Sequence, residues 1–411
     1  MKKYGILIIL MAFIMVISSF SFGSTVNING QTKTLETLVV SDRTFVTSDS
    51  MKSYGLNTIV TEEQIKVFNS NVEFVFFNLS NRVKVNGIEM TMDSKTFKRN
   101  GKVYIPMRFI FEAMNYEVGY NSNTKQITMK TRTEVKFPLT IEDSGKSYTF
   151  QKPVESIVSL APSITEILFA IGAESKILGR TIYCKYPLAT EKIRTVGSLY
   201  EPDLEGILDL APDAVIAATH MNEDVMKKLG QAGISTITQK SPEKTAEIYT
   251  LIEQLGLITD RNYTARALVS TLKAKEQRIN NIVKVIPQNE LKTVYYVVAT
   301  GNKEYSAGKL TFIHEVLSGA GGINVAADVD KWAYSLEKLL DHNPEFILGE
   351  KYQFDTMIES GNYKSLSALK NGKFIFVDTN LFSIPGPRVI DGGMKLVIET
   401  LYPKYKYMLN Y

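Results

Sequence analysis

The sequence predicts an α/β protein in which two parallel-sheet lobes are joined by one long helix and preceded by a small β-rich (α+β) domain. The first indication is the stretch 260–285, which contains neither Gly nor Pro and repeats apolar residues close to the helical period. At about 1.5 Å per residue such a helix is about 39 Å long, enough to cross a domain. The second indication is a sequence motif that occurs on both sides of that helix, at 204–216 and 336–348, and is called the repeated phrase below. Each copy has a Glu, a Pro seven residues later and then an apolar, strand-like run.

Composition describes an ordinary globular chain. Its 411 residues suffice for two or three domains, and 44% are hydrophobic while 22% are charged. The net charge of +4 is spread thinly, with no run of five or more Lys and Arg. Nucleic acid is therefore not expected among the partners.

The N-terminus has the features of a signal peptide. Lys2 and Lys3 precede an apolar run over 5–17. Small residues then precede the predicted cleavage site after Gly23. This predicts a signal peptide over 1–23 and an exported protein at the cell surface, in the cell wall or in the periplasm. An uncleaved anchor is the alternative, although the run is short for a membrane span. Cys184 is the only cysteine, which excludes an intramolecular disulfide and a lipid-bearing cysteine behind the apolar run.

Residues 24–132 are predicted to form the β-rich domain. The segments 42–57 and 101–117 share the order of a strand, a short helix and a turn. The pattern indicates a duplicated unit of strand, short helix and hairpin that repeats at about sixty residues.

The second copy, NGKVYIPMRFIFEAMNYEVGYNSNTKQITM, resembles the small domain named after the N-terminal region of copper amine oxidases. The resemblance implies a stalk or attachment module, with the cell wall as a candidate partner. It does not imply catalysis, because Glu112 stands where that enzyme's cofactor motif would have Thr. The three histidines, His220, His314 and His342, form no His-x-His pair for copper. No metal site is predicted.

Residues 133–411 are predicted to form the binding domain, with lobes at 153–258 and 290–411 around the connecting helix 260–285. Ser163 and Glu166 have the spacing of a capping box that opens a helix over 164–171. Strands and helices then alternate, which is typical of parallel sheets with ligand loops at the strand ends. The predicted strands are 156–160, 214–217, 235–239, 294–299 and 373–377, and the remaining helices are 224–229, 244–255, 310–319, 336–341 and 389–401.

Residues 154–403 resemble the helix-linked class of periplasmic binding proteins that feed ABC importers of metal chelates. The resemblance rests on IVSLAPSITEILFAIGA, TIYCKYPLATEKIRTVGSLYEPDLEGILDLAPDAVI, EYSAGKLTFIHEVLSGAGGINVA, SLEKLLDHNPEFIL and FSIPGPRVIDGGMKLV, in the family's order. Tyr183-Cys184-Lys185-Tyr186-Pro187, with the later Val196-Gly197, is most similar to cobalamin-binding members. The resemblance implies a binding protein, not an enzyme, with no catalytic residues and no cofactor apart from a metal-chelate ligand.

Loops at the strand ends are expected to form an aromatic cleft with few charges, which suits a broad, flat and largely uncharged macrocycle. A tri-anionic siderophore would instead need several converging cations, and only Arg180, Lys185 and Arg388 are near. The predicted ligand-binding residues are Tyr183, Tyr186, Leu199, Tyr200, His220 and Met221 on the first lobe, and Tyr305, Trp332, Tyr334 and Phe382 on the second.

Two residues have alternative interpretations. His220 could ligate the metal of a haem or cobalamin, or it could be a solvated loop histidine. Cys184 could coordinate the metal as a thiolate, or it could be a small packed residue.

Glu205 and Glu337 occupy equivalent places in the repeated phrase, each after a residue suited to cap a helix, Asp203 or Ser335. The helix dipole alone would stabilise either carboxylate. The resemblance implies a further role. In the helix-linked family, a glutamate at this place on each lobe pairs with arginines of the membrane permease.

The sequence thus predicts an extracytoplasmic binding protein that captures a corrinoid, cobalamin, and delivers it to an ABC permease. A haem or an iron-siderophore is the alternative ligand. An adhesive or structural module of the cell wall is the alternative of another class.

Overall fold

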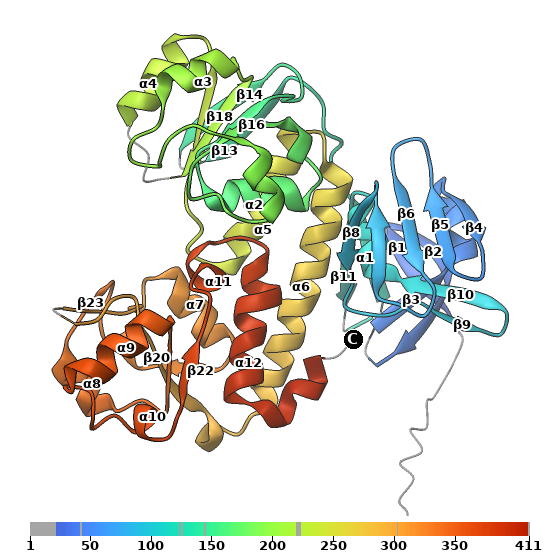
Figure 1. Ribbon diagram of the computed structural model, residues 1–411. Coiled ribbons are helices and arrows are strands. Elements are labelled where there is room, and N and C mark those ends of the chain that lie inside the picture. Colours follow the sequence, from blue (N-terminus) through green and yellow to red (C-terminus); the bar gives the residue numbers. More distant parts are fainter. Residues whose placement is uncertain are drawn as a thin grey trace, which may run out of the picture.

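The computed structural model describes residues 22–41, 43–121, 123–124, 126–143, 145–218, 223–301 and 303–409. Figure 1 shows two α/β lobes, one above the other, joined along one side by the long helix α6 (Asn262–Val285). The β-rich domain lies against the opposite side of α6. The predicted fold class is confirmed. The predicted signal peptide lies almost wholly outside the described residues, and within them no helix is long and apolar enough to cross a membrane.

The N-terminal domain contains two antiparallel-rich sheets. The first has the order β11-β12-β1-β2-β3-β10-β9 and the second the order β4-β5-β6-β7-β8. The strands are β1 (Phe22–Ile28), β2 (Gln31–Val40), β3 (Arg43–Thr47), β4 (Asn57–Val60), β5 (Gln64–Phe68), β6 (Glu73–Phe77), β7 (Arg82–Val85), β8 (Ile88–Thr91), β9 (Phe97–Arg99), β10 (Lys102–Pro106), β11 (Tyr116–Asn121) and β12 (Gln126–Thr131).

The predicted duplication is visible in the order of these elements. In the first copy β3 is followed by the short helix η1 (Ser48–Tyr54) and the hairpin β4-β5, and in the second β10 is followed by α1 (Met107–Ala113) and the hairpin β11-β12. The first strands of the two copies, β3 and β10, pair with each other in antiparallel register. The first strands of the two copies therefore share one sheet, whereas the hairpin β4-β5 lies in the second sheet and β11-β12 in the first.

The first lobe is built on a parallel sheet with the order β17-β16-β15-β18-β19. A hairpin of β13 (Leu139–Asp143) and β14 (Lys146–Phe150) precedes it. The lobe consists of β15 (Ile157–Ser159), α2 (Pro162–Ala170), β16 (Ile177–Arg180), β17 (Arg194–Thr195), α3 (Leu204–Leu210), β18 (Ala214–Ala218), α4 (Glu223–Gln231), β19 (Ser235–Gln239) and α5 (Thr245–Ile258).

The second lobe has a parallel sheet with the order β22-β20-β24-β25, and a separate ribbon of β21 and β23. Its elements are β20 (Lys292–Tyr296), β21 (Glu304–Tyr305), α7 (Phe312–Gly319), β22 (Gly322–Asn324), β23 (Ala333–Tyr334), α8 (Leu336–His342), β24 (Phe346–Gly349), α9 (Lys351–Ser360), α10 (Ser367–Lys370), β25 (Phe374–Phe376), α11 (Asn380–Ser383), the π-helix η6 (Val389–Met394) and α12 (Lys395–Leu401).

The repeated phrase folds in the same way in both lobes. The helices α3 and α8 are each seven residues long, and each ends on a residue in the left-handed region, Ala211 at φ 42° and Asn343 at φ 41°. The proline that follows cannot continue a helix, so the chain turns into the strand β18 or β24. This local design explains why the phrase recurs.

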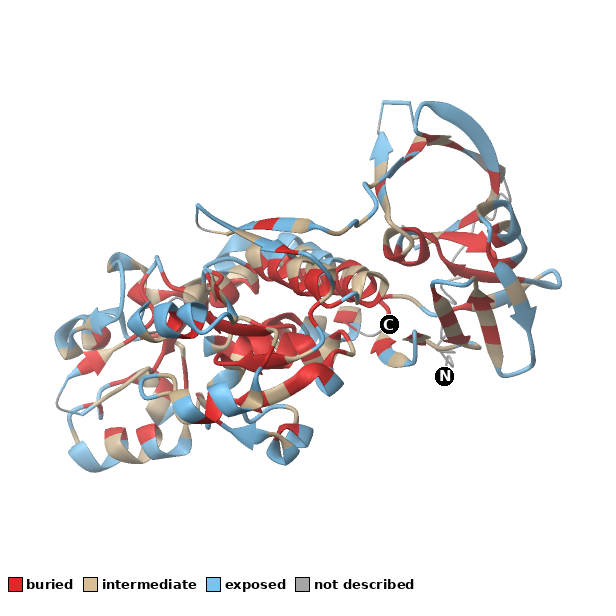
Figure 2. Cartoon of the chain, turned by 90° about the horizontal axis from the view of Figure 1, so that it is seen from above, coloured by how far each residue is buried: buried red, intermediate tan, exposed pale blue. Residues whose placement is uncertain are grey.

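The long helix begins two residues later than predicted, because Thr259 ends α5 and Asp260 adopts a positive φ of 56°. Its apolar side chains lie in the common core, which includes Ala265, Leu272 and Ile279. Figure 2 shows buried residues concentrated along the helices that meet at the middle of the binding lobes. The prediction of one connecting helix is confirmed.

Several predicted boundaries were wrong in detail. The strand expected over 294–299 is β20, which ends at Tyr296, and the helix expected over 310–319 is α7, which begins at Phe312. The helix expected over 164–171 begins at Pro162, and its N-cap Ala161 makes no side-chain capping bond, so Ser163 and Glu166 form no capping box. The helix expected over 389–401 opens as the π-helix η6 before α12.

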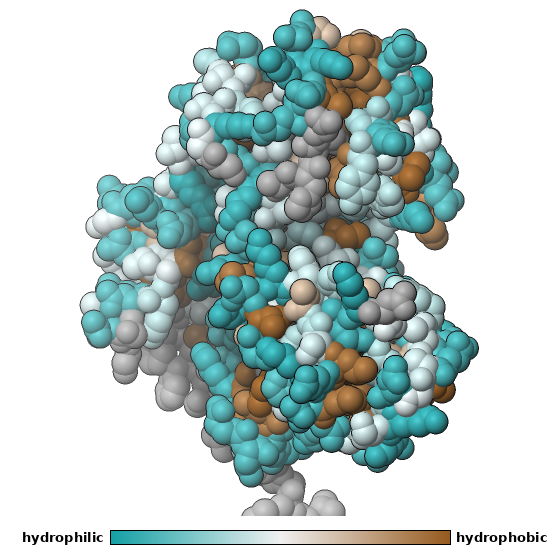
Figure 3. Space-filling model, turned by 90° about the vertical axis from the view of Figure 1, so that its left-hand side faces the viewer, coloured by the Kyte–Doolittle hydropathy of each residue, from teal (hydrophilic) through white to brown (hydrophobic). Residues whose placement is uncertain are grey.

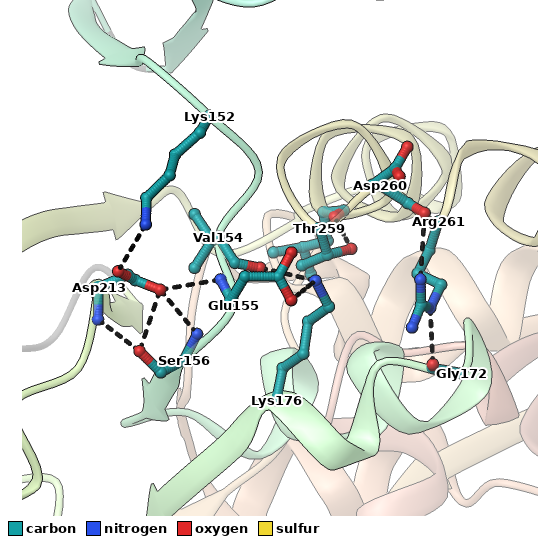
Figure 4. Close-up of polar contacts among 11 residues, drawn as sticks. Lys152, Val154, Glu155, Ser156, Gly172, Lys176, Asp213, Thr259, Asp260 and Arg261 are labelled. Atoms are coloured by element: carbon teal, nitrogen blue, oxygen red, sulfur yellow. Dashed lines mark hydrogen bonds and ion pairs between the residues drawn. The ribbon is translucent and has the colours of Figure 1, made fainter.

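The segment that joins the β13-β14 hairpin to the first lobe is fixed by polar contacts, which Figure 4 shows. The Asp213 carboxylate accepts hydrogen bonds from the backbone N–H groups of Glu155 and Ser156, at 2.9 and 3.0 Å, and from the Ser156 hydroxyl at 3.0 Å. The buried Lys176 donates to the Val154 carbonyl at 2.9 Å and to Glu155 at 2.8 Å. These bonds fix the first strand of the lobe beside β18.

The N-terminal domain packs directly on the binding domain. Its helix α1 lies against α6. Arg132 forms an ion pair with Glu253 of α5 at 3.0 Å, and Arg278 of α6 donates to the Asp93 carbonyl at 2.7 Å. Gly172, after α2, leaves room for the Ile88 side chain, since a Cβ there would approach it to 2.5 Å. The domain is therefore held against α6 along much of the helix.

Candidate ligand-binding cleft

Tyr183 and Tyr186 lie on the loop that follows β16, at the carboxyl end of the first lobe's sheet. The loop is anchored from below by Arg180, whose guanidinium donates to the carbonyls of Thr190 at 2.7 Å and Thr181 at 3.0 Å. The two tyrosine side chains stay about half exposed, at 45% and 47%. The anchored loop thus presents two aromatic rings to solvent.

Cys184 is buried in the same loop, with its Sγ atom 3.3 Å from the Thr181 hydroxyl and 4.0 Å from the Ser159 carbonyl. This contact set favours the interpretation of Cys184 as a small packed residue. Among the described residues, no group of three or more His, Cys, Asp and Glu side chains is placed to hold a metal ion.

Leu199 and Tyr200 lie on the next loop, after β17. A bridge between Gly197 and Pro202 closes that loop, and the Ser198 hydroxyl accepts the backbone N–H of Tyr200 at 3.2 Å. Tyr200 is 72% exposed, whereas Leu199 packs partly against the core of the lobe. Tyr200 is therefore the more accessible of the two.

The second lobe gathers Tyr305, Trp332 and Tyr334 on the β21-β23 ribbon, where Tyr305 pairs with Ala333. Trp332 is 43% exposed, and its carbonyl accepts the Ser306 N–H at 2.8 Å. Figure 1 places β23 on the side of this lobe that is turned toward the first lobe. A cavity of about 460 Å³ lies beside the ribbon and is lined by Tyr305 and Tyr334, among others.

Tyr334 is fixed by two partners. Its hydroxyl lies 3.1 Å from the Val325 carbonyl and 2.7 Å from His342 Nδ1. Burial raises the pKa of Tyr334 well above that of a free phenol, with Asp328 adding to the effect. The phenol is therefore neutral, and its one hydroxyl proton is donated to the Val325 carbonyl.

Glu304 supports the ribbon from inside, and sequence reasoning missed it. This buried carboxylate accepts from the hydroxyl of Thr300 at 3.0 Å, from Tyr363, and from Tyr295 at 3.4 Å. A glutamate next to an apolar strand carries no signal of such a role in the sequence. Its bonds fix the strand on which Tyr305 lies.

The prediction that Phe382 lines the cleft was wrong. Its side chain is fully buried, and its ring centroid lies 5.4 Å from that of Tyr296. Packing of α11 onto the sheet takes this ring into the core. His220 and Met221 lie outside the described residues, so their roles stay predictions.

A second interaction missed by the sequence joins the two lobes. Arg388 belongs to the second lobe, yet its Nε atom donates to the Glu166 carboxylate of α2 at 2.9 Å and its backbone N–H at 3.1 Å. The guanidinium also lies over the Tyr186 ring, 3.8 Å from the centroid. Burial raises the pKa of Glu166, and Arg388 offsets part of that rise.

Two of the cations near the cleft are engaged by protein groups, whereas Lys303, which lines the cavity beside the ribbon, is exposed and forms no ion pair among the described residues. Arg180 is buried and bonded to carbonyls, and Arg388 is bonded to Glu166 and stacked on Tyr186. Of the three cations that the sequence suggested, only Lys185 is exposed with no ion pair among the described residues. Figure 3 looks onto the open side of the two lobes and shows a hollow between them.

Glu205 and Glu337 lie in the first turns of α3 and α8 and are exposed. Each helix is capped by the preceding residue: Asp203 accepts the Gly206 N–H at 2.9 Å, and Ser335 accepts the Lys338 N–H at 3.1 Å. Within the described part of the chain, neither glutamate forms an ion pair. The two carboxylates are thus equivalent and free for an outside partner.

Two parallel-sheet lobes, one connecting helix and an aromatic cleft at the strand ends define a solute-binding protein rather than an enzyme. The chain belongs to the periplasmic binding protein family, whose model matches residues 157–381. The model of the copper amine oxidase N-terminal domain matches residues 25–129 and, overlapping them, 84–144.

Known proteins similar to this chain are binding proteins as well. An uncharacterised ABC transporter substrate-binding lipoprotein of Bacillus subtilis is 32% identical over 291 residues, which cover 69% of this chain and 92% of that protein. A cobalamin-binding protein of Halobacterium salinarum is 25% identical over 272 residues, covering 62% and 72%. The structure of a periplasmic haem-binding protein from Pseudomonas aeruginosa has a TM-score of 0.56 at 23% identity, covering 61% of this chain and 93% of that one, and shows the shared fold alone.

Proposed function

We propose that the protein is the extracytoplasmic binding component of an ABC importer and that it captures a corrinoid, cobalamin, between its lobes. The observation that carries the proposal is the combination of exposed aromatic side chains with two arginines, Arg180 and Arg388, whose donors are directed to protein groups. The exposed aromatic residues are Tyr183, Tyr186 and Tyr200 on the first lobe and Trp332 on the second. Aromatic walls bury a broad, flat ligand well.

The bonding of the two arginines supports a corrinoid over the alternative ligands. A tri-anionic siderophore needs several arginines or lysines with unused donors, and the two propionates of haem need cations as well. Here Arg180 and Arg388 direct their donors to protein groups. A corrinoid with neutral amide side chains makes no such demand and can use the hydroxyl groups of the tyrosines. The cobalamin-binding relative supports the same ligand.

Glu205 and Glu337 are proposed to dock the protein on its permease. They occupy equivalent first turns on the two lobes, as a partner with two similar subunits would require. Charge pairs at such a contact orient the complex and speed association more than they add affinity.

Export is proposed from the predicted signal peptide over 1–23. A cut after Gly23 would leave most of β1, including its pairing with β12 through Val26. The N-terminal domain is proposed as the attachment module, with the cell wall as its partner.

The proposal can be tested by titrating the purified protein with cyanocobalamin, haemin and a ferric siderophore. Trp332 is the only tryptophan and lies on the cleft-side ribbon, so its fluorescence reports on this site. Cyanocobalamin is expected to quench it saturably at one equivalent, and the siderophore is expected to have no specific effect. Saturable quenching by haemin or the siderophore alone would identify the alternative ligand. No saturation with any of the three would favour the adhesive module.

A further inference from the structure

A second hollow lies far from the cleft, where the N-terminal domain meets the start of α6. This interdomain groove is bounded by the turns β5-β6 and β7-β8, the corner from α1 to β11, the segment after β12 and the first turns of α6. Its volume is about 700 Å³, which falls within the range of small-molecule sites and far exceeds what one inorganic ion fills. Figure 1 shows β11 and α1 beside the upper part of α6.

The walls of the interdomain groove are almost wholly polar. Met114 and Val135 are the only apolar side chains among the residues that line it, and the rest are amides, hydroxyls, tyrosines and charged groups. Such a lining offers many donors and acceptors, which suits a ligand rich in hydroxyl groups because each hydroxyl both donates and accepts.

Arg266 gives the interdomain groove an unpaired cation. It makes no hydrogen bond and no ion pair within the described residues, whereas nearby Arg132 is paired with Glu253 at 3.0 Å. Burial lowers the pKa of Arg266 and the charge of Arg132 lowers it further, while Glu253 and Tyr263 offset part of this effect. A partly buried cation beside another cation is stabilised by an incoming anion, and the arginine fork matches a carboxylate in particular.

Two amide oxygens in the same wall also lack partners. The Oδ1 atoms of Asn115 and Asn262 are buried and accept no hydrogen bond, although the Asn115 amide nitrogen donates to the Arg132 carbonyl at 2.9 Å. Unsatisfied buried acceptors are costly, and a small rotation of either side chain would let a ligand hydroxyl donate to it. Nearby Arg261 already uses its Nε atom on the Gly172 carbonyl at 2.8 Å, as Figure 4 shows.

From this arrangement we infer that the interdomain groove binds an acidic saccharide, whose carboxylate pairs with Arg266 and whose hydroxyls bond the amides of Asn115 and Asn262. Tyr116 and Tyr263, which also line the groove, add flat faces for a sugar ring. The site needs both domains, because Asn115 belongs to the N-terminal domain and Arg266 to α6. The sugar could be free in solution or part of a cell-wall glycan, and both sources present the same chemistry.

The test measures binding to the full-length mature protein by saturation-transfer NMR and calorimetry. The probes are glucuronate, N-acetylmuramic acid, glucose and inorganic phosphate, together with sedimentation on purified cell-wall glycan. Saturable binding of glucuronate or N-acetylmuramic acid, at least tenfold tighter than of glucose or phosphate, supports the inference. Glucuronate binding without sedimentation on the glycan indicates a free sugar, whereas binding of N-acetylmuramic acid with such sedimentation indicates the wall.

Arg266→Gln is expected to weaken acidic-sugar binding at least tenfold. Lys284→Gln removes the same charge from the same helix, eighteen residues away and so about 27 Å along it, and should change nothing. Equal binding of phosphate or glucose, or no binding of any sugar, would overturn the inference, as would equal affinities of the two variants. Melting temperature and corrinoid titration of each variant serve as folding controls. The outcome is independent of the ligand in the cleft.

Discussion

Arg388 and Glu166, 222 residues apart in the chain, form the contact that joins the lobes at the base of the cleft: Nε donates to the carboxylate at 2.9 Å while the same guanidinium covers the Tyr186 ring. The side chain of Glu166 is almost fully buried and that of Arg388 is 19% exposed. Gly386 permits the approach, because a Cβ there would lie 2.8 Å from the carboxylate. Arg388 of the second lobe thus contacts both a buried carboxylate and a predicted ligand-binding ring of the first lobe.

Arg388→Met is expected to destabilise the protein by about 3 kcal/mol at neutral pH, because it leaves Glu166 buried without its partner. The pKa of Glu166, already raised by burial, should rise further once the opposing charge is gone. Urea unfolding followed by Trp332 fluorescence measures the loss. The double variant Glu166→Gln/Arg388→Met should recover part of it. A double variant that loses the sum of the two single losses would show that the residues act independently.

The second prediction concerns motion between the lobes. The connecting helix α6 and the Arg388–Glu166 pair both resist the wide closure available to lobes on flexible hinges. X-ray scattering with and without bound corrinoid should therefore give the same radius of gyration within error. A contraction of several ångströms on binding would show that the lobes close as a hinge.

Asp213 gives a prediction on pH. Burial disfavours its charge, but hydrogen bonds from Glu155 and Ser156 outweigh burial and hold its pKa below the ordinary 3.8. A carboxyl whose pKa is lower in the folded than in the unfolded protein stabilises the fold at pH values above its unfolded pKa. This stabilisation is lost as the pH falls through the folded-state pKa. Asp213→Asn should thus cost about 1–2 kcal/mol near neutral pH, and the gap to wild type should shrink below pH 3.8. The exposed Asp209→Asn is the control. A gap that stays constant with pH would mean that the charge of Asp213 does not matter.

Local patterns in the sequence predicted much of the fold. The strand 235–239 was predicted with the ends that β19 has, because three consecutive β-branched residues, 236–238, follow a Gly turn there. The repeated phrase predicted α3 and α8 because capping, dipole and proline signals all act within a few residues. In each case the determinants lie inside the element itself.

The contacts between distant segments could not be predicted in this way. Ser163 and Glu166 fit a capping box, yet Glu166 bonds Arg388 of the other lobe, and this tertiary contact overrides the local pattern. Phe382 was placed in the cleft because it follows a strand, whereas packing against Tyr296 buries it. The interdomain groove has no sequence signal, since its walls come from both domains.

Glu205 and Glu337 allow a test of transport that leaves the cleft intact. Replacing both by Lys should place like charges against a basic permease surface and oppose docking. The double variant should bind corrinoid normally and fail to support uptake in cells that lack the native gene, while each single variant is impaired less. Asp209→Lys, on the same helix as Glu205, is the control. Full uptake by the double variant would contradict docking and would mean that the two carboxylates only interact with the dipoles of their own helices.

The central claim is that a corrinoid binds between the lobes, and calorimetric titration of cyanocobalamin tests it most directly. Wild-type protein is predicted to bind one equivalent, and Trp332→Ala to bind about 1–3 kcal/mol more weakly through loss of an aromatic anchor, with an unchanged melting temperature. Tyr120→Ala, an exposed aromatic of the N-terminal domain, should bind like wild type. Absence of saturable cyanocobalamin binding by the folded wild-type protein, or an affinity that Trp332→Ala leaves unchanged, would contradict the account.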